Sequence, residues 1–241
     1  MTEIAQILYD NAGPFSRARK ADAVYHAVKR AILLRSLKAG DALIEQQIAA
    51  AVGCSQGPVR EALLRLEQDG LVARRGYQGT LVSATSAAEA AKMAQIRIEI
   101  ETAGVKMATP AITTAKLDEL ARLLDDLEDA EDRLDAYAKS DLDRAFHLAI
   151  FRASGMQALE PILVRCCLHM HRFTFGNESR ESGPAANDDL RGPSRDQHRE
   201  IFEAIAAGRA EEAAETLRQH IEAVIAYWAP DLQSAMLANP K

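Results

Sequence analysis

The stretch from Leu43 to Val82 constrains this chain most, because its pattern predicts a helix, a tight turn, a second helix and a short hairpin. In the first helix, Ile44, Ile48 and Ala49 recur at the spacing of one helical face. Gly53 follows them and can end this helix, since glycine adopts positive φ without steric cost. The segment therefore predicts a compact helix-turn-helix.

The second helix and the hairpin that follows it indicate a DNA-binding module. Ser55 is a good N-cap, and the helix after it carries one apolar stripe, formed by Val59, Ala62, Leu63 and Leu66. Residues 71–73 and 80–82 then predict two short strands, joined by a turn that carries two arginines. A helix-turn-helix with a basic hairpin is a winged module whose second helix enters the major groove. We expect DNA contacts from Ser55, Gln56, Gly57, Arg60, Arg74, Arg75 and Gly76.

A family resemblance rests on the run from Pro58 to Val72, PVREALLRLEQDGLV. Over residues 21–83 the chain closely resembles the N-terminal domain of the GntR family of bacterial transcription regulators. That family usually has Ser-Arg where this chain has Ser55-Gln56, and its arginine commonly contacts DNA. Gln56 can also hydrogen-bond a base edge or a phosphate, so the departure bears on which operator sequence is bound.

The charge distribution agrees with a DNA-binding front half, although the 241-residue chain has a net charge of −6. Residues 1–85 hold 11 Lys and Arg against 8 Asp and Glu, whereas the remainder holds 18 against 27. The basic excess is modest, so we expect a homodimer that doubles the contacts to double-stranded DNA. No apolar run approaches the roughly 20 residues of a membrane span. Three cysteines imply no disulfide framework, so we expect a cytoplasmic protein.

From Ser86 onward, every periodic segment predicts a helix and none predicts a convincing strand. The fold class is therefore mainly α, with a flexible lead-in over 1–18, a winged helix-turn-helix over 19–83 and an all-helical domain over 84–241. Pro230 closes the last predicted helix, and residues 176–192 predict a mobile loop. About six helices are expected, over 87–108, from after Thr114 to 130–137, and over 139–153, 156–174, 193–208 and 210–228.

Three of these helices place possible metal ligands on apolar faces. Asp143 and His147 lie one turn apart on one helix, while His198 and His220 lie on two later helices. Three imidazoles and one carboxylate suit Zn, Ni, Fe(II), Co or Mn, with Zn, Ni or Mn favoured here. Alternatively, Asp143 forms a capping box with Ser140, and the histidines are hydrogen-bonded core residues.

A second resemblance favours the metal interpretation. The run from Asp143 to His147, the Gln197-His198 pair and His220 resemble the FCD ligand-binding domain of the FadR subfamily, in which such residues hold a metal. The resemblance also implies a small organic acid as effector. One oxygen of such a carboxylate would bind the metal and another would bind Arg97. Alternatively, Arg97 forms an ion pair with Glu101 one turn on.

These observations predict a transcription regulator of the repressor type, whose operator affinity is controlled by a small carboxylate bound at a divalent metal. One alternative is a regulator in which the metal ion itself is the signal. Another is a metallohydrolase attached to a DNA-binding domain, since a metal with open positions can activate water. No nucleophile motif or phosphate loop supports an enzyme. His169, His171 and Arg172 are weaker candidates for lining the same site, and the Cys166-Cys167 pair predicts core packing.

Overall fold

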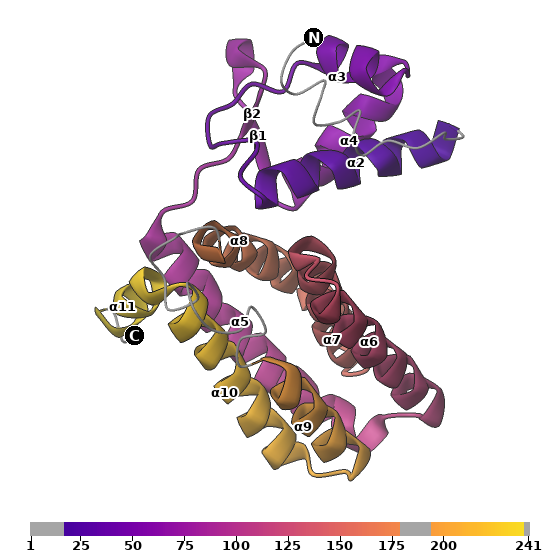
Figure 1. Ribbon diagram of the computed structural model, residues 1–241, viewed down its shortest axis with the longest axis vertical. Helices are drawn as coiled ribbons and strands as arrows, with labels where there is room; N and C mark the ends of the chain where they lie inside the picture. The colour runs from indigo at the N-terminus through magenta and orange to yellow at the C-terminus, as the bar shows by residue number, and fades with distance from the viewer. Residues whose placement is uncertain (1–16, 179–193, 239–241) are drawn as a thin grey trace. The chain divides into compact units, whose positions relative to one another are not determined.

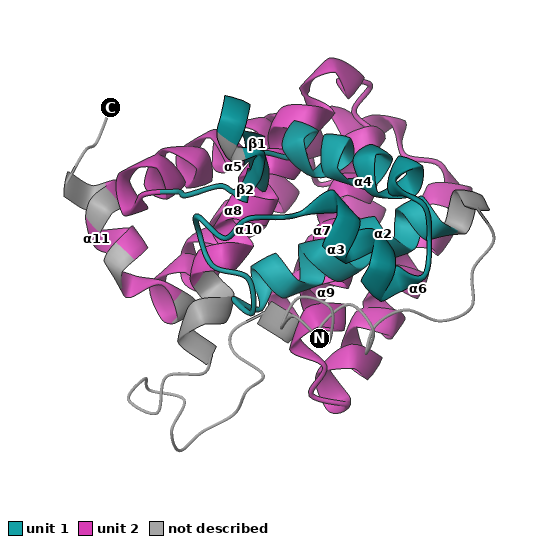
Figure 2. Ribbon diagram, turned by 90° about the horizontal axis from the view of Figure 1, so that it is seen from above, with its two compact units in different colours: residues 1–85 teal, residues 86–241 magenta. Residues whose placement is uncertain are grey.

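The computed structural model describes residues 17–178 and 194–238. The chain divides into two compact units at the junction of Thr85 and Ser86 (Figure 2). The predicted lead-in over 1–18 lies outside the described residues except for its last two, which open the first helix. Most of the predicted loop over 176–192 also lies outside them.

The first unit has the predicted helix-turn-helix and wing (Figure 1). Strands β1 and β2 pair antiparallel, with Val72 opposite Val82. Ala42 forms an isolated bridge with Leu81, so the chain before α3 adds a third segment to the wing sheet. The elements are α2 (Arg17–Leu33), α3 (Glu45–Val52), α4 (Gln56–Gln68), β1 (Val72–Arg74), the 3-10 turn η1 (Gly76–Gln78) and β2 (Thr80–Val82).

The core of this unit is apolar and forms chiefly between α2 and α4. The predicted stripe of α4 is buried, since Val59, Ala62, Leu63 and Leu66 are all fully covered. Gly53 ends α3 with a φ of 63°, as expected for a residue without a Cβ. Ser55 occupies the N-cap position of α4, but its side chain makes no capping hydrogen bond.

The second unit is helical throughout its described residues, which form seven helices. Helix α5 lies at the centre, where it packs against α7, α8, α10 and α11 (Figure 1). Helices α6 and α7 pack side by side, as do α9 and α10. The helices are α5 (Ala87–Ala108), α6 (Thr114–Asp132), α7 (Ala136–Arg152), α8 (Glu160–Glu178), α9 (Ser194–Ala206), α10 (Ala210–Trp228) and α11 (Pro230–Ala238), with 3-10 turns η2 (Thr109–Ala111) and η3 (Gln157–Leu159).

Local capping explains where several of these helices begin. Ser86 and Glu89 form a reciprocal capping box at the start of α5. Thr113 accepts a hydrogen bond from the backbone of Lys116 at the start of α6. Asp135 does the same for α7, so Ser140 lies inside that helix. The alternative in which Asp143 and Ser140 form a capping box is therefore wrong.

Helix α6 ends at Asp132, within the range predicted for its end, and Leu134 beyond it is 63% exposed with a positive φ. One prediction about a helix end is wrong. Pro230 was expected to close the regular structure, but it opens α11. Proline is well suited to this first helical position, because its fixed φ matches a helix. The N–H that it lacks would have no hydrogen-bond partner within the helix at this position.

The buried face of α5 consists mostly of small residues. Met93, Ile96 and Ile100 are only partly buried, whereas the fully covered positions are mostly alanines. Arg97 and Glu101 lie on the same covered face and are 2% and 3% exposed. The central helix therefore carries a charge pair into the core of the unit.

Both cysteines of the Cys166-Cys167 pair are free and buried, which confirms the prediction of core packing. Among the residues that the structure describes, no helix combines the length and apolar character needed to cross a membrane.

Candidate functional site

The exposed face of α4 carries the residues that sequence reasoning assigned to DNA. Ser55, Gln56 and Gly57 are exposed at its start, and Arg60 follows one turn later. Arg60 donates from Nε to Glu45 of α3 at 2.6 Å and from Nη2 to Gln56 Oε1 at 3.1 Å. These contacts hold the two side chains together on one outer surface, where both can present hydrogen-bonding groups to a base edge or phosphate.

Arg65, on the same helix, makes its contacts with α2. Its Nη1 lies 2.5 Å from Asp22 Oδ1, and its guanidinium carbon lies 4.3 Å from the centre of the Tyr25 ring. Both partners belong to α2. Arg65 therefore ties α2 to α4, and its role is structural.

The wing presents Arg74, Arg75 and Gly76 at the surface. Arg74 is partly anchored, because its Nε lies 3.7 Å from Glu67 Oε2. Tyr77, which was not among the predicted contacts, is the most exposed large hydrophobic residue in the described part of the chain. An aromatic residue at the tip of a basic hairpin was the sequence signal that could have identified it.

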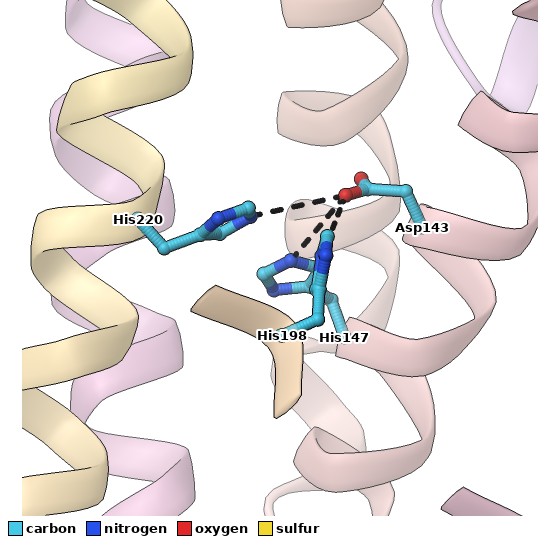
Figure 3. A group of neighbouring side chains, drawn as sticks. All are labelled: Asp143, His147, His198 and His220. Carbon is cyan, nitrogen blue, oxygen red and sulfur yellow. Dashed lines mark hydrogen bonds and ion pairs between the residues drawn. The ribbon is translucent and has the colours of Figure 1, made fainter. Parts of the chain in front are cut away.

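In the helical unit the four predicted metal ligands come together (Figure 3). Asp143 and His147 extend from α7, His198 from α9 and His220 from α10. One donor atom from each residue lies within 4.8 Å of all the others. The Nε2 atoms of His147, His198 and His220 lie 3.7, 3.0 and 3.8 Å from Asp143 Oδ1. Histidines from three helices thus converge on one carboxylate oxygen.

The opposite nitrogens of two of these rings have polar partners. His147 Nδ1 is in short contact with Glu101 Oε2, and His220 Nδ1 lies 3.2 Å from Gln197 Oε1. Contacts of this kind fix the ring orientation and the tautomer of a metal-binding histidine. Sequence reasoning treated Glu101 only as a partner for Arg97 and gave Gln197 no role at the histidines.

A fourth histidine lies beside the group. His171 Nε2 is 3.5 Å from Asp143 Oδ2, and its Nδ1 is 2.7 Å from the Ser140 hydroxyl. The two carboxylate oxygens of Asp143 therefore have different neighbours, since Oδ1 meets the three predicted ligand histidines and Oδ2 meets His171. His169 and His171 are both buried, and His171 contacts Asp143.

The electrostatics favour ionised Asp143 and Glu101 carboxylates beside a neutral His220 imidazole. Burial opposes ionisation of Asp143, but the surrounding histidines, His147 first, lower its pKa well below the usual range. Burial also opposes ionisation of Glu101, and Arg97 with His147 lowers its pKa to about 2. Burial and the neighbouring His198 lower the pKa of His220 to about 3. Ionised carboxylate and neutral imidazole are the forms in which these groups bind metal ions.

The donor set fits a divalent cation. His147 Nε2, which faces Asp143, is buried and has no hydrogen-bond partner among the described residues. Buried polar atoms are seldom left unpaired, because the lost hydration is not recovered. Three imidazoles with one carboxylate are borderline ligands suited to zinc, nickel or manganese.

Comparison with known proteins divides the chain at the same place. Residues 20–82 match the family described as "Bacterial regulatory proteins, gntR family", and residues 92–223 match the family described as "FCD domain". The second match alone covers more than half of the chain.

Named relatives agree with these matches. A transcriptional regulator in an unstable DNA locus of Streptomyces ambofaciens is 29% identical over 83% of this chain and 81% of its own length. The transcriptional regulator McbR of Escherichia coli is 32% identical over 56% of this chain and 62% of its own length. Its solved structure superposes with a TM-score of 0.71 at 25% identity, covering 88% of this chain and 98% of that one.

Proposed function

The chain belongs to the GntR family of bacterial regulators, with an FCD domain as its helical unit, and we propose that it is a repressor controlled by a small organic acid. It is a DNA-binding transcription regulator and not an enzyme, as its family and its named relatives are regulators. The convergence of Asp143, His147, His198 and His220 on one point beside a buried arginine carries the proposal.

On the DNA side, we infer that the chain acts as a homodimer on a pseudo-palindromic operator. Ser55, Gln56, Gly57 and Arg60 would contact the major groove, while Arg74, Arg75 and Gly76 would reach from the wing. A second subunit doubles a contact set whose basic excess is modest, and two-fold symmetry in the protein is matched by two-fold symmetry in its site.

On the effector side, Asp143, His147, His198 and His220 would hold one zinc, nickel or manganese ion. When bound, the ion would supply a positive centre for one oxygen of a carboxylate. The burial of all three histidines supports a site that is closed to bulk water, in which such a contact is strengthened.

Arg97 would bind the second oxygen of the effector, and its contacts within the protein determine which of its nitrogens is available for this. Its Nε donates to Glu101 at 2.5 Å, so the alternative in which the two form an ion pair is correct. Its Nη1 lies 3.7 Å from Met170 Sδ, a weak contact. Its Nη2 is buried and has no hydrogen-bond partner among the described residues. This nitrogen is therefore the group on Arg97 best suited to an anionic oxygen.

Control of DNA binding needs more than effector binding. The effector must favour one arrangement of the two reading heads over another, because a ligand with equal affinity for both arrangements shifts nothing. We therefore expect the effector to bind more weakly when the protein is held on its operator.

A thermal-shift screen of the full chain against a panel of small mono-, di- and tricarboxylates, with and without a chelator, tests this proposal. We expect at least one acid to raise the melting temperature of the metal-loaded protein and to lose that effect after chelation. A panel that shifts nothing in the metal-loaded protein would contradict the carboxylate assignment. If DNA affinity instead tracks the metal with no acid present, the ion itself is the signal.

A further inference from the structure

Both oxygens of the Glu101 carboxylate are engaged inside the helical unit. Oε1 accepts from Arg97 Nε at 2.5 Å, and Oε2 is in short contact with Nδ1 of His147. The Glu101 side chain is 2% exposed, so neither contact is shared with bulk water. One buried side chain thus joins a ligand residue to the arginine assigned to the effector.

This contact determines which nitrogen of His147 carries the proton. An ionised carboxylate accepts hydrogen bonds and donates none, so Nδ1 of His147 must be the protonated nitrogen. A neutral imidazole in that tautomer presents a lone pair at Nε2. That atom is buried, has no hydrogen-bond partner among the described residues and lies 3.7 Å from Asp143 Oδ1. Glu101 therefore holds His147 in the tautomer that can bind a cation through Nε2.

Packing alone gives little reason for a charge at this position. Removing two ions from water costs several kcal/mol for each, and a buried ion pair is often no more stable than apolar residues of similar volume. The rest of the buried α5 face is largely alanine. A glutamate that satisfies both a histidine and an arginine here is better explained by orientation of the site than by stability.

We propose that Glu101 is a positioning residue, which fixes the His147 ring for the cation and links it to Arg97. This inference rests on the proposed function, because it assigns Glu101 to the same site. It implies that the positions of the ligand His147 and the effector-binding Arg97 are not independent. Loss of the carboxylate should weaken cation binding although no ligand has been removed.

The test compares Glu101→Gln with wild type in full-length protein, using Co²⁺ and Zn²⁺ as probes. Partners that orient metal ligands typically contribute about 10–100-fold in metal affinity, so we expect a loss of that order in chelator-competition titrations. We also expect an altered visible absorption spectrum of bound Co²⁺, because a freed His147 ring changes the ligand geometry. Glu131→Gln is the matched control, since Glu131 is a buried glutamate of the same unit that pairs with Lys139 at 3.1 Å.

Glu101→Gln removes the charge that balances the buried Arg97 guanidinium, which opposes folding of that variant. A second comparison avoids this problem by measuring Arg97→Met against Arg97→Met with Glu101→Gln, so that only the carboxylate differs. The same 10–100-fold loss is expected there. Nitrogen NMR of the metal-free wild type should show His147 protonated at Nδ1.

The outcomes separate the two proposals. Wild type that binds neither ion would overturn both the metal site and the role of Glu101. Wild type that binds an ion, with unchanged affinity and Co²⁺ spectrum when the carboxylate is removed, would overturn the role of Glu101 alone. Protonation of His147 at Nε2 in the metal-free protein would also overturn it.

Discussion

The two units of this regulator place their charged functional groups in opposite environments. On the winged unit, the Arg60 side chain is 61% exposed and its contacts with Glu45 and Gln56 are at the surface. In the helical unit, Arg97 and Glu101 form their ion pair with side chains 3% and 2% exposed, and His147 is fully buried. The arginine assigned to DNA stays in water, whereas the charged groups beside the proposed metal site are removed from it.

This difference fits the ligands that we propose for the two units. A DNA backbone is large and highly charged, so surface side chains can reach it without prior burial. A small ion or acid offers few contacts, so its site must be dry and preorganised. Substitutions in the winged unit should therefore change DNA affinity with little effect on stability. Substitutions of the buried cluster formed by Asp143, His147, His198 and His220 should change ligand binding and stability together.

The largest effect is expected from removing a metal ligand. Replacing His198 or His220 with Ala takes away one of four donors that no neighbouring side chain replaces in the same position. We expect each purified variant to lose its metal and its response to carboxylates, while metal-free DNA binding stays near wild type. Elemental analysis with a gel-shift titration measures both. Full metal content in both variants would remove these residues from the ligand set.

The next largest effect is an expected loss of stability of the helical unit in acid. His220 has a folded pKa of about 3 and an ordinary unfolded value near 6.5, so between these values the unfolded chain binds the extra proton. The free energy of unfolding of the metal-free helical unit should therefore fall as the pH drops from 6.5 towards 3. Glu101, with a folded pKa of about 2, adds a further loss below about pH 4.5.

Trp228 reports this acid effect, because it is the only tryptophan of the chain and lies in α10 of the helical unit. Urea unfolding followed by its fluorescence should show stability decreasing below pH 6.5, with a shallower dependence in His220→Gln. A stability that is constant from pH 6.5 to 5 in the metal-free protein would argue against a buried neutral His220.

The packing of the two units can be compared by replacing one glycine in each unit with alanine. A Cβ on Gly104 would lie 2.7 Å from Phe151 Cδ2, whereas a Cβ on Gly57 would meet nothing within 4 Å. Overpacking a core costs about 1–3 kcal/mol, which exceeds the roughly 1 kcal/mol that alanine gains over glycine in a helix. Gly104→Ala should therefore destabilise the protein and Gly57→Ala should not. Chemical unfolding of both variants decides this, and equal stabilities would contradict the packing difference.

The smallest effect on stability is expected at Arg60. Its exposed ion pair contributes about 0–1 kcal/mol to folding. Arg60→Ala should nevertheless weaken binding to DNA selected from a random pool by about 1–3 kcal/mol if it contacts a base edge. Arg65→Ala is the matched control on the same helix, because Arg65 contacts α2, and it should leave DNA affinity near wild type. Equal losses in the two variants would remove the special role of Arg60.

The sequence predicted most of the fold because its signals were local. Helix α5 was expected over 87–108 and has those bounds, since Ser86 and Glu89 cap it. The extra helix α11 was missed because proline was taken as the end of regular structure, although it also suits the first position of a helix.

The candidate site was predicted less completely, because its surroundings depend on contacts between distant segments. Helical spacing placed Asp143 and His147 on one face and His198 and His220 on apolar faces of two later helices, and the FCD resemblance favoured a shared metal over separate core roles. No spacing in the sequence could place Glu101 against His147, which lies 46 residues later. The contact of His171 with Asp143 depends likewise on the packing of α8 against α7.

The central claim is that a buried metal and acid site controls an exposed DNA-binding surface. The most direct measurement is the affinity of the full-length protein for its selected DNA, titrated with a carboxylate identified by thermal shift, before and after removal of the metal. We predict that the acid weakens DNA binding of the metal-loaded protein and has no effect on the stripped protein. An equal response in both forms, or none in the loaded form, would contradict the account.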